Sequence, residues 1–293
     1  MYKEVAIDPE CMKDFSYYSL IKMEFGFEKG RYISAVIKQW AREAYPHVKG
    51  SDMPPVRKKS ITNFLNGLMK SRVHELFLLA DYRRTIAWKD WIDWWSEQNQ
   101  KHSFALTLSE GRVENSVDYM AVLEGAECWK IKPTLMLDRN PDEIVDVLEP
   151  LLKISSELTI IDLYFSFAEN KTLVELLRRI QAVGAKISDF HLITAIETSD
   201  PSAVFEREYR SLVPESMNFR VTEVPQRYIH DRYFITNSGA LKAGYGFKDG
   251  VEQGAPADKL SVNLASLEEC DHVMRGVSEA YAEGKARVVF PLP

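Results

Sequence analysis

The segment LTIIDLYF, residues 158–165, predicts a buried β-strand that carries one acidic residue, Asp162. It is strongly apolar and rich in β-branched and aromatic residues, which favour strands. Residues 170–182 follow with apolar side chains at helical spacing: Leu173, Leu176, Leu177 and Ile180. Gly184 then ends the predicted helix. A strand followed directly by an amphipathic helix indicates an α/β unit.

The same alternation continues on both sides of this segment. Residues 140–153 predict a helix, with Asn140 as the N-cap, Pro141 at the first position and Glu143 completing a capping box. Further strands are predicted at 190–195 and 219–224, with a helix near 203–212 between them. Two more strands, 233–236 and 241–243, flank the turn residues Ser238 and Gly239. This pattern predicts an α/β domain with helices packed on a sheet.

The first part of the chain is predicted to be mainly helical. Apolar residues recur at helical spacing in 33–40 and again in 61–68, on either side of a break at 49–55. Residues 76–80 (LFLLA) fit a strand or a helix equally, and 102–108 alternate like a strand. The tryptophans Trp88, Trp91, Trp94 and Trp95 could stack on bases, but core or interface packing is favoured. We therefore expect a helical domain at 1–125 and an α/β domain at 126–293.

Composition excludes several classes of protein. Hydrophobic residues make up 45% of the 293 residues and charged ones 27%, which is usual for a globular chain. No apolar run approaches the roughly 18 residues of a membrane span, and no signal peptide is evident. Cys11, Cys128 and Cys270 lie far apart, which argues against a zinc site or a disulfide scaffold. We expect a cytoplasmic protein.

The net charge of −6 is unevenly distributed along the chain. Residues 1–100 carry 16 Lys and Arg against 13 Asp and Glu, whereas the remainder carries 21 against 30. The acidic remainder is a poor general surface for nucleic acid. The one compact basic run, Arg57-Lys58-Lys59, fits a local nucleic-acid site or, as the favoured interpretation, a solvated helix start.

The segment His230-Asp231-Arg232 is the strongest candidate for chemistry. On an extended chain His230 and Arg232 point the same way, because side chains alternate. A guanidinium grips phosphate oxygens, and an imidazole can attack phosphorus or transfer a proton. The glycines that follow, Gly244 and Gly246, allow a close backbone approach.

These residues resemble the motif of the phospholipase D superfamily, His-x-Lys-x-x-x-x-Asp followed by glycine. The matching positions here are His230, Arg232, Asn237 and Gly244. Asp162 and Tyr164 match the Asp-Pro-Tyr that is common upstream, with Leu163 in place of proline. The stretch 230–239 also resembles the non-catalytic phospholipase D-like domain that follows microtubule-interacting-and-trafficking modules, and uncharacterised bacterial phospholipase D-like proteins. The resemblance covers roughly residues 130–293 and implies a mixed sheet flanked by helices.

The resemblance implies a role for each matching residue. It makes His230 the nucleophile or general acid and Arg232 the phosphate ligand, with Asn237 at the position of the motif's acid. Asp231 and Asp162 are candidate substitutes for that acid. The family's chemistry needs no metal and no cofactor, and it uses two histidines. Because this chain has one such motif, the resemblance implies a homodimer that pairs two copies of His230.

Two departures leave the activity open. Arg232 replaces the lysine of the motif, which preserves charge but not shape, and Asn237 replaces the acid. One hypothesis is a metal-independent phosphodiesterase or nuclease that acts on DNA or RNA, in a bacterial phage-defence or mobile-element system by analogy. The other is an inactive module that binds a phosphate-bearing ligand or a partner protein, with the N-terminal half docking that partner. A third interpretation makes His230, Asp231 and Arg232 a network that only stabilises the fold.

Overall fold

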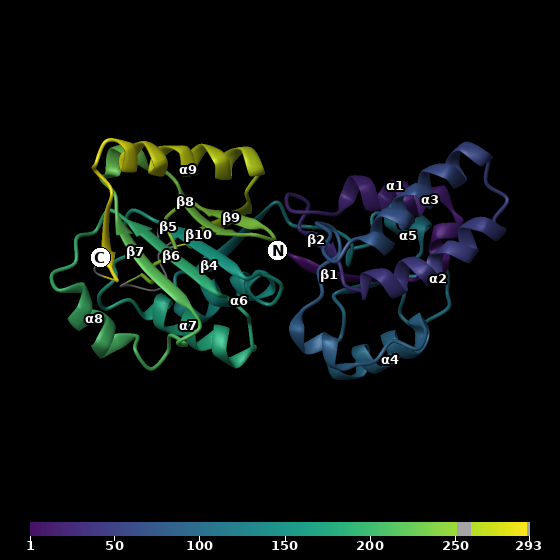
Figure 1. The fold of residues 1–293 in the computed structure, drawn as a ribbon, viewed down its shortest axis with the longest axis horizontal. Helices are drawn as coiled ribbons and strands as arrows, with labels where there is room; N and C mark the ends of the chain where they lie inside the picture. Colours follow the sequence, from purple (N-terminus) through teal and green to yellow (C-terminus); the bar gives the residue numbers. More distant parts are fainter. Residues whose placement is uncertain (251–258, 292–293) are drawn as a thin grey trace. The chain divides into compact units, whose positions relative to one another are not determined.

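The computed structural model describes residues 1–250 and 259–291. Contacts divide the chain into an N-terminal unit, Tyr2–Ile131, and a C-terminal unit that begins at Lys132. Both units are drawn in Figure 1. The chain is mixed α/β, as predicted, and each unit has its own sheet.

The N-terminal unit is built from helices around a small parallel sheet. The strands β1 (Lys3–Ile7), β2 (Arg31–Ile33) and β3 (Leu106–Leu108) pair in the order β2-β1-β3. The helices are α1 (Phe15–Glu24), α2 (Ile37–Gly50), α3 (Pro55–Lys70), α4 (Trp91–Lys101) and α5 (Tyr119–Leu123). Two 3₁₀ turns, η1 (Pro9–Lys13) and η2 (Asp81–Thr85), connect them. The predicted helix at 61–68 lies within α3, whereas the one predicted at 33–40 was placed too early, because Ile33 belongs to β2 and α2 begins at Ile37.

Tertiary contacts explain the conformation of residues 76–80 and the positions of the tryptophans in this unit. The segment 76–80 forms neither a helix nor a full strand but one isolated parallel bridge, in which Leu76 and Leu78 exchange backbone hydrogen bonds with Ile33 at the sheet edge. The tryptophans are core residues, since Trp91 and Trp94 are fully buried. The helix α4 begins only at Trp91, so Trp88 packs on Trp94 from outside the helix.

The C-terminal unit contains a mixed sheet whose described strands follow the order β11-β7-β6-β5-β8-β9-β10-β4. The neighbouring pairs β5–β6 and β6–β7 are parallel, and the other neighbouring pairs of described strands in this sheet are antiparallel. The bounds are β4 (Thr134–Asp138), β5 (Glu157–Ile161), β6 (Asp189–Thr194), β7 (Asn218–Glu223), β8 (Arg232–Thr236), β9 (Ala240–Ala243), β10 (Lys259–Leu264) and β11 (Arg287–Phe290). The predicted turn at Ser238-Gly239 does join β8 to β9, with Thr236 N–H donating to the Gly239 carbonyl.

Helices cover both faces of this sheet (Figure 1). One face carries α6 (Pro141–Leu152), α7 (Lys171–Ala182) and α8 (Pro201–Glu208), and the other carries α9 (Leu267–Ala282). Asn140 caps α6 as predicted, accepting a 2.9 Å hydrogen bond from Glu143 N–H. The 3₁₀ turn η3 (Gln226–Tyr228) lies between β7 and β8. The sheet whose strands β5 and β8 position Asp162 and the segment before β8 is therefore covered by helices on both faces.

His191 on β6 is a core residue. It is 8% exposed, and its Nε2 lies 2.7 Å from the Thr222 hydroxyl, which in turn contacts Tyr281 of α9. Burial, followed by the nearby Arg220 guanidinium, lowers the pKa of His191 to about 4. His191 therefore stays neutral in the folded protein at pH values where an exposed histidine is charged.

We expect His191 to make the C-terminal unit less stable in mild acid. Below about pH 6.5 the unfolded chain takes up a proton that the folded chain refuses until about pH 4. Between pH 6.5 and 5 this group should lower the free energy of unfolding by about 2 kcal/mol. Urea denaturation at both pH values measures it, with His191→Gln as the variant that cannot titrate. An identical loss in both proteins would contradict the expectation.

Candidate phosphate-binding site

The topology brings the end of β5 beside the start of β8. These strands pair antiparallel, with Ile161 opposite Tyr233, so residues that follow β5 meet residues that precede β8. The carboxyl ends of β6 and β7 lie at the same edge, because those strands run parallel to β5. Open α/β sheets bind ligands at such an edge, where the strand direction changes.

Asp162 anchors this edge from a fully buried position. Its carboxylate accepts hydrogen bonds from the backbone N–H groups of Tyr164, at 2.9 Å, and Phe247, at 2.6 Å. Burial raises the pKa of Asp162, and the two N–H donors oppose that rise. Gly246 has a φ of +90°, and a Cβ there would lie 2.4 Å from Asp162 Oδ2. Only glycine lets the loop after β9 close on this carboxylate.

Arg232 lies close to the residues that the sequence grouped with it. Its guanidinium carbon is 5.3 Å from the centre of the Tyr164 ring, and its Nη1 donates to the Gly244 carbonyl at 3.3 Å. The Arg232 Nε is buried and has no hydrogen-bond partner in the part of the chain that is described. Asp162, Tyr164, Arg232 and Gly244 are therefore brought together at the sheet edge.

His230 has different surroundings from Arg232. The chain bends at Asp231, and β8 begins only at Arg232, so the strand's alternation of side chains does not extend back to His230. His230 is exposed and lines a pocket together with Asp231 and Tyr233, whereas Arg232 is not part of the lining.

Asn237 lies at the opposite end of β8 from His230. Its Oδ1 accepts hydrogen bonds from the backbone N–H groups of Ser156, at 3.0 Å, and Glu157, at 3.3 Å. A strand rises about 3.3 Å per residue, so Asn237 is roughly 17 Å along the chain from Arg232. In this structure Asn237 ties the β8–β9 turn to the start of β5.

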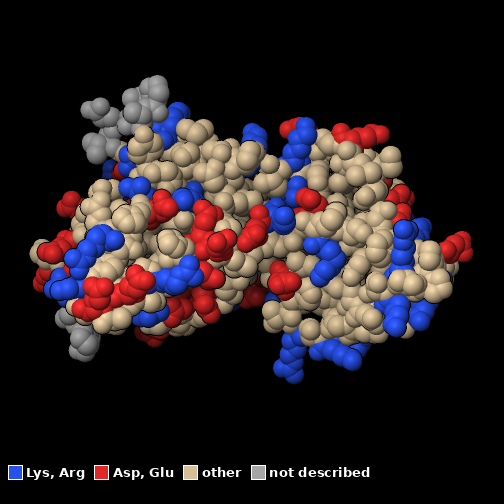
Figure 2. Space-filling model, turned by 90° about the horizontal axis from the view of Figure 1, so that it is seen from above, with Lys and Arg blue, Asp and Glu red and all other residues tan. Residues whose placement is uncertain are grey.

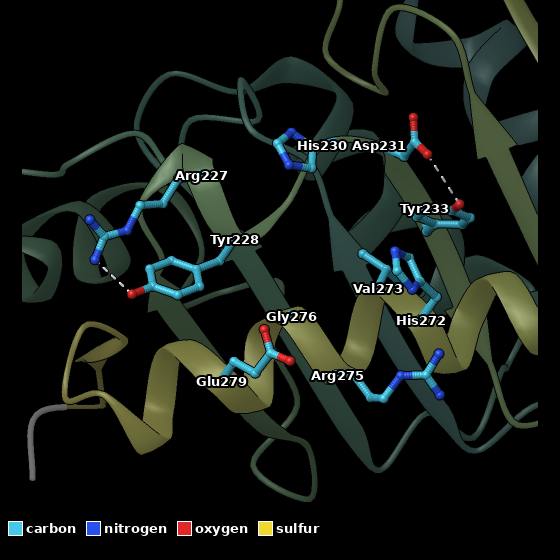
Figure 3. A pocket seen from close by; sticks show the side chains of 10 residues that line it. All are labelled: Arg227, Tyr228, His230, Asp231, Tyr233, His272, Val273, Arg275, Gly276 and Glu279. Carbon is cyan, nitrogen blue, oxygen red and sulfur yellow. Dashed lines mark hydrogen bonds between the residues drawn. The ribbon is translucent and has the colours of Figure 1, made fainter.

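The pocket that contains His230 lies between the segment before β8 and the helix α9 (Figure 3). We call it the α9 pocket, and its volume is about 250 Å³. His230 and Asp231 come from the strand side, and His272, Arg275 and Glu279 project from α9. The complete lining is Arg227, Tyr228, His230, Asp231, Tyr233, His272, Val273, Arg275, Gly276 and Glu279.

The sequence of α9 explains how this wall of the pocket forms. Ser266 and Glu269 make a reciprocal capping box at its start. One stripe of the helix is buried on the sheet: Cys270, Val273, Val277 and Ala280. A second stripe, at the same helical spacing, faces the pocket: His272, Arg275, Gly276 and Glu279. A Cβ at Gly276 would lie 2.3 Å from the Tyr228 carbonyl oxygen, so glycine permits the close approach of α9 to η3.

The charges in the α9 pocket are partly compensated. Asp231 pairs with Lys242 at 2.9 Å, and Arg227 donates to the Tyr228 hydroxyl at 2.7 Å. Across residues 1–250 and 259–291, the side chains of His230, His272 and Arg275 make no hydrogen bond or ion pair. Three exposed groups that can donate to an anion thus line one pocket and have no internal partner among the described residues.

Sequence reasoning missed the residues that complete this pocket: Arg227, His272 and Arg275. No helix was predicted for residues 267–282, although Ser266 and Glu269 have capping-box spacing and Val273, Val277 and Ala280 follow at helical intervals. That spacing could have found α9. Nothing local to His272 could have placed it near His230, because the two meet only through the packing of α9 on the sheet.

The structure offers no set of three His, Cys, Asp or Glu side chains that could hold a metal ion, as far as its described residues show. In the same residues, no helix is both long and apolar enough to cross a membrane.

Comparisons with known proteins give little further information. The chain matches no protein-family model, and no curated protein matches its sequence. Among solved structures, it is similar to TrmBL2, an archaeal chromatin protein whose structure shows a novel mode of DNA binding. That match has 11% sequence identity and a TM-score of 0.29, and it covers 94% of this chain and 93% of that one. A likeness at this level carries no argument about fold or function.

Proposed function

We propose that the C-terminal unit is a phospholipase D-like domain that binds a phosphodiester ligand in the α9 pocket. One observation carries the proposal: His230, His272 and Arg275 line the pocket from two separate elements, and no described residue pairs with them. A phosphodiester needs donors from more than one side, and the guanidinium and imidazole groups supply them.

The size and composition of the pocket suit a single phosphate and its neighbouring groups. Sites for whole small-molecule ligands span about 300–1,000 Å³, and this pocket is smaller, at about 250 Å³. Asp231 and Glu279 also line it, so a ligand of several adjacent phosphates would meet repulsion. A phosphodiester, with one negative charge, fits this balance better, and a nucleic-acid backbone presents that group repeatedly.

Removing the unpaired basic groups of α9 should weaken binding of a phosphodiester. We expect the full-length His272→Ala/Arg275→Ala variant to bind a thymidine dinucleotide at least about tenfold more weakly, since each lost charge-assisted hydrogen bond contributes about 1.5–3 kcal/mol. Isothermal titration calorimetry in EDTA measures the change. Arg178→Ala removes an exposed arginine of α7 and is the matched control. Equal affinities for the two variants would exclude the α9 pocket as the site.

A second candidate function, phosphodiester cleavage, is favoured by the two histidines of the pocket. His230 and His272 belong to one chain, so a nucleophile and a general acid would not require a second copy. One imidazole would form an N–P bond as the P–O bond to the leaving group breaks, and the other would donate a proton to the departing oxygen. Water would then hydrolyse the phosphohistidine.

Hydrolysis of bis-(p-nitrophenyl) phosphate in EDTA separates cleavage from binding alone. A cleaving pocket should lose activity in both His230→Ala and His272→Ala, while Arg178→Ala keeps it. No turnover by the unmodified chain, together with intact dinucleotide binding, would identify a binding domain and exclude the cleavage candidate.

A further inference from the structure

The helix α3 presents a basic face that the rest of the N-terminal unit does not cover. Along this 16-residue helix Lys59, Asn63, Gly67 and Lys70 are exposed at helical spacing and share one face, and Arg57 is exposed on the flank of that face. The opposite face is anchored in the core by Ile61, Leu65 and Leu68. The orientation of α3 is therefore set by burial, and its exposed face is a rigid feature of the unit.

The charges of α3 are all positive and mostly unpaired. The helix contains Arg57, Lys58, Lys59 and Lys70 and no acidic residue. Arg57 lies over the Phe15 ring at 5.1 Å, and Lys58 donates to the Lys49 carbonyl at 3.3 Å. Within the described residues, Lys59 and Lys70 have no ion-pair partner. Positive side chains in the first turn of a helix interact unfavourably with the helix dipole, so these cations lower the stability of the helix.

Gly67 leaves the backbone of α3 open on its exposed face. It lies in the last turns of α3, where glycine destabilises a helix. An added Cβ would meet no atom within 4 Å, so internal packing does not require glycine at this position. A surface that must approach the helix backbone closely would require it.

We propose that α3 binds in the major groove of duplex DNA. The helices α2 and α3 are joined by the four-residue segment 51–54, the length of connection found in helix–turn–helix motifs, in which the second helix enters the groove. A helix of this length spans about 24 Å, and the groove is about 12 Å wide and admits an α-helix. Arg57, Lys59 and Lys70 would contact phosphates, and Asn63 would lie between them, facing the base edges.

The surface of the N-terminal unit agrees with a local site of this kind. Figure 2 shows both Lys and Arg side chains, in blue, and Asp and Glu side chains, in red, scattered over the surface of that unit. Lys22 of α1 adds a cation beside α3, since its Nζ lies 5.6 Å from the Phe64 ring. Residues 1–100 carry 16 Lys and Arg against 13 Asp and Glu, so the overall net charge of −6 does not describe this part of the chain.

The test measures binding of the full-length chain to a 20-base-pair DNA duplex by fluorescence anisotropy between 50 and 200 mM salt. The variant Arg57→Ala/Lys59→Ala/Lys70→Ala should bind at least about tenfold more weakly at 50 mM salt. Its slope of log affinity against log salt should be shallower by about 2.7, or 0.9 for each lost phosphate contact. The matched control, Lys29→Ala/Lys89→Ala/Lys101→Ala, removes three exposed lysines outside α3 and should leave the slope unchanged.

A second variant distinguishes binding from folding. Gly67→Leu should raise the melting temperature, because leucine favours a helix, and should still weaken duplex binding by blocking the approach. The proposal is overturned if the unmodified chain does not bind the duplex at 50 mM salt, or if the two triple variants bind equally. Equal binding of duplex RNA would also overturn it, because the deep, narrow major groove of RNA does not admit a helix. Dinucleotide binding in the α9 pocket is measured separately, so either proposal can fail alone.

Discussion

Replacing Arg83 with methionine is expected to destabilise the N-terminal unit by about 3–5 kcal/mol, the usual cost of removing one partner of a buried ion pair. Arg83 is fully buried. Its Nε and Nη2 donate to the two carboxylate oxygens of Glu4, at 2.6 and 2.7 Å, and its guanidinium lies 4.0 Å from the Phe104 ring centre. Methionine fills much of the same volume but leaves the Glu4 carboxylate without its charge partner.

The neighbouring arginine is a matched control for this prediction. Arg84 is exposed and pairs with Asp81 at 3.1 Å, and exposed pairs of this kind contribute about 0–1 kcal/mol. Urea denaturation followed by circular dichroism should therefore separate Arg83→Met from Arg84→Met by at least about 2 kcal/mol. The double variant Glu4→Gln/Arg83→Met should recover part of the loss, since no unpaired charge remains. Similar stabilities for the two single variants would show that the buried pair contributes little.

Asp162→Ala is the second substitution with a large expected effect, a loss of about 4 kcal/mol from the C-terminal unit. Two backbone N–H groups, those of Tyr164 and Phe247, donate to this carboxylate. Each buried donor left unpaired costs about 1–3 kcal/mol. The loop that carries Gly246 would also lose its attachment to the end of β5, because Asp162 is the contact that joins them.

The effect of Asp162→Ala should extend to the sheet edge around it. Arg232 lies near Asp162, and the Arg232 guanidinium is one of the charges that favour the ionised carboxylate. Chemical denaturation measures the stability loss, with Glu206→Ala as an exposed carboxylate control on α8. Asp162→Asn should cost less than alanine, because one amide oxygen can still accept a hydrogen bond. A loss below about 1 kcal/mol for Asp162→Ala would mean that water replaces the carboxylate.

Much of the C-terminal fold follows from local patterns. The predicted strand at 158–165 overlaps β5 (Glu157–Ile161) but was too long, because the strand ends before Asp162, whose carboxylate accepts backbone hydrogen bonds in the loop that follows. The apolar spacing after Asn170 corresponds to α7. Asn140 starts α6, and the Ser238-Gly239 turn joins two strands. These features depend on residues near one another in the chain, so the sequence expresses them directly. The strand β1 and the helix α9 were not predicted, although the capping-box spacing at the start of α9 was present.

Part of the candidate site could likewise be predicted from local sequence, and the rest depends on tertiary packing. The segment from His230 to Gly244, with Asp162 and Tyr164, could be singled out from residue types and spacing alone. The bend at Asp231 separates His230 from Arg232, and Asn237 serves the far end of β8 instead. The α9 pocket exists because a helix that starts 37 residues after His230 packs on the sheet and brings His272 and Arg275 into the lining of the same pocket. The spacing of residues within a segment indicates the local backbone conformation. Contacts between side chains far apart in the sequence depend on long-range packing, which cannot be predicted from the spacing within either segment.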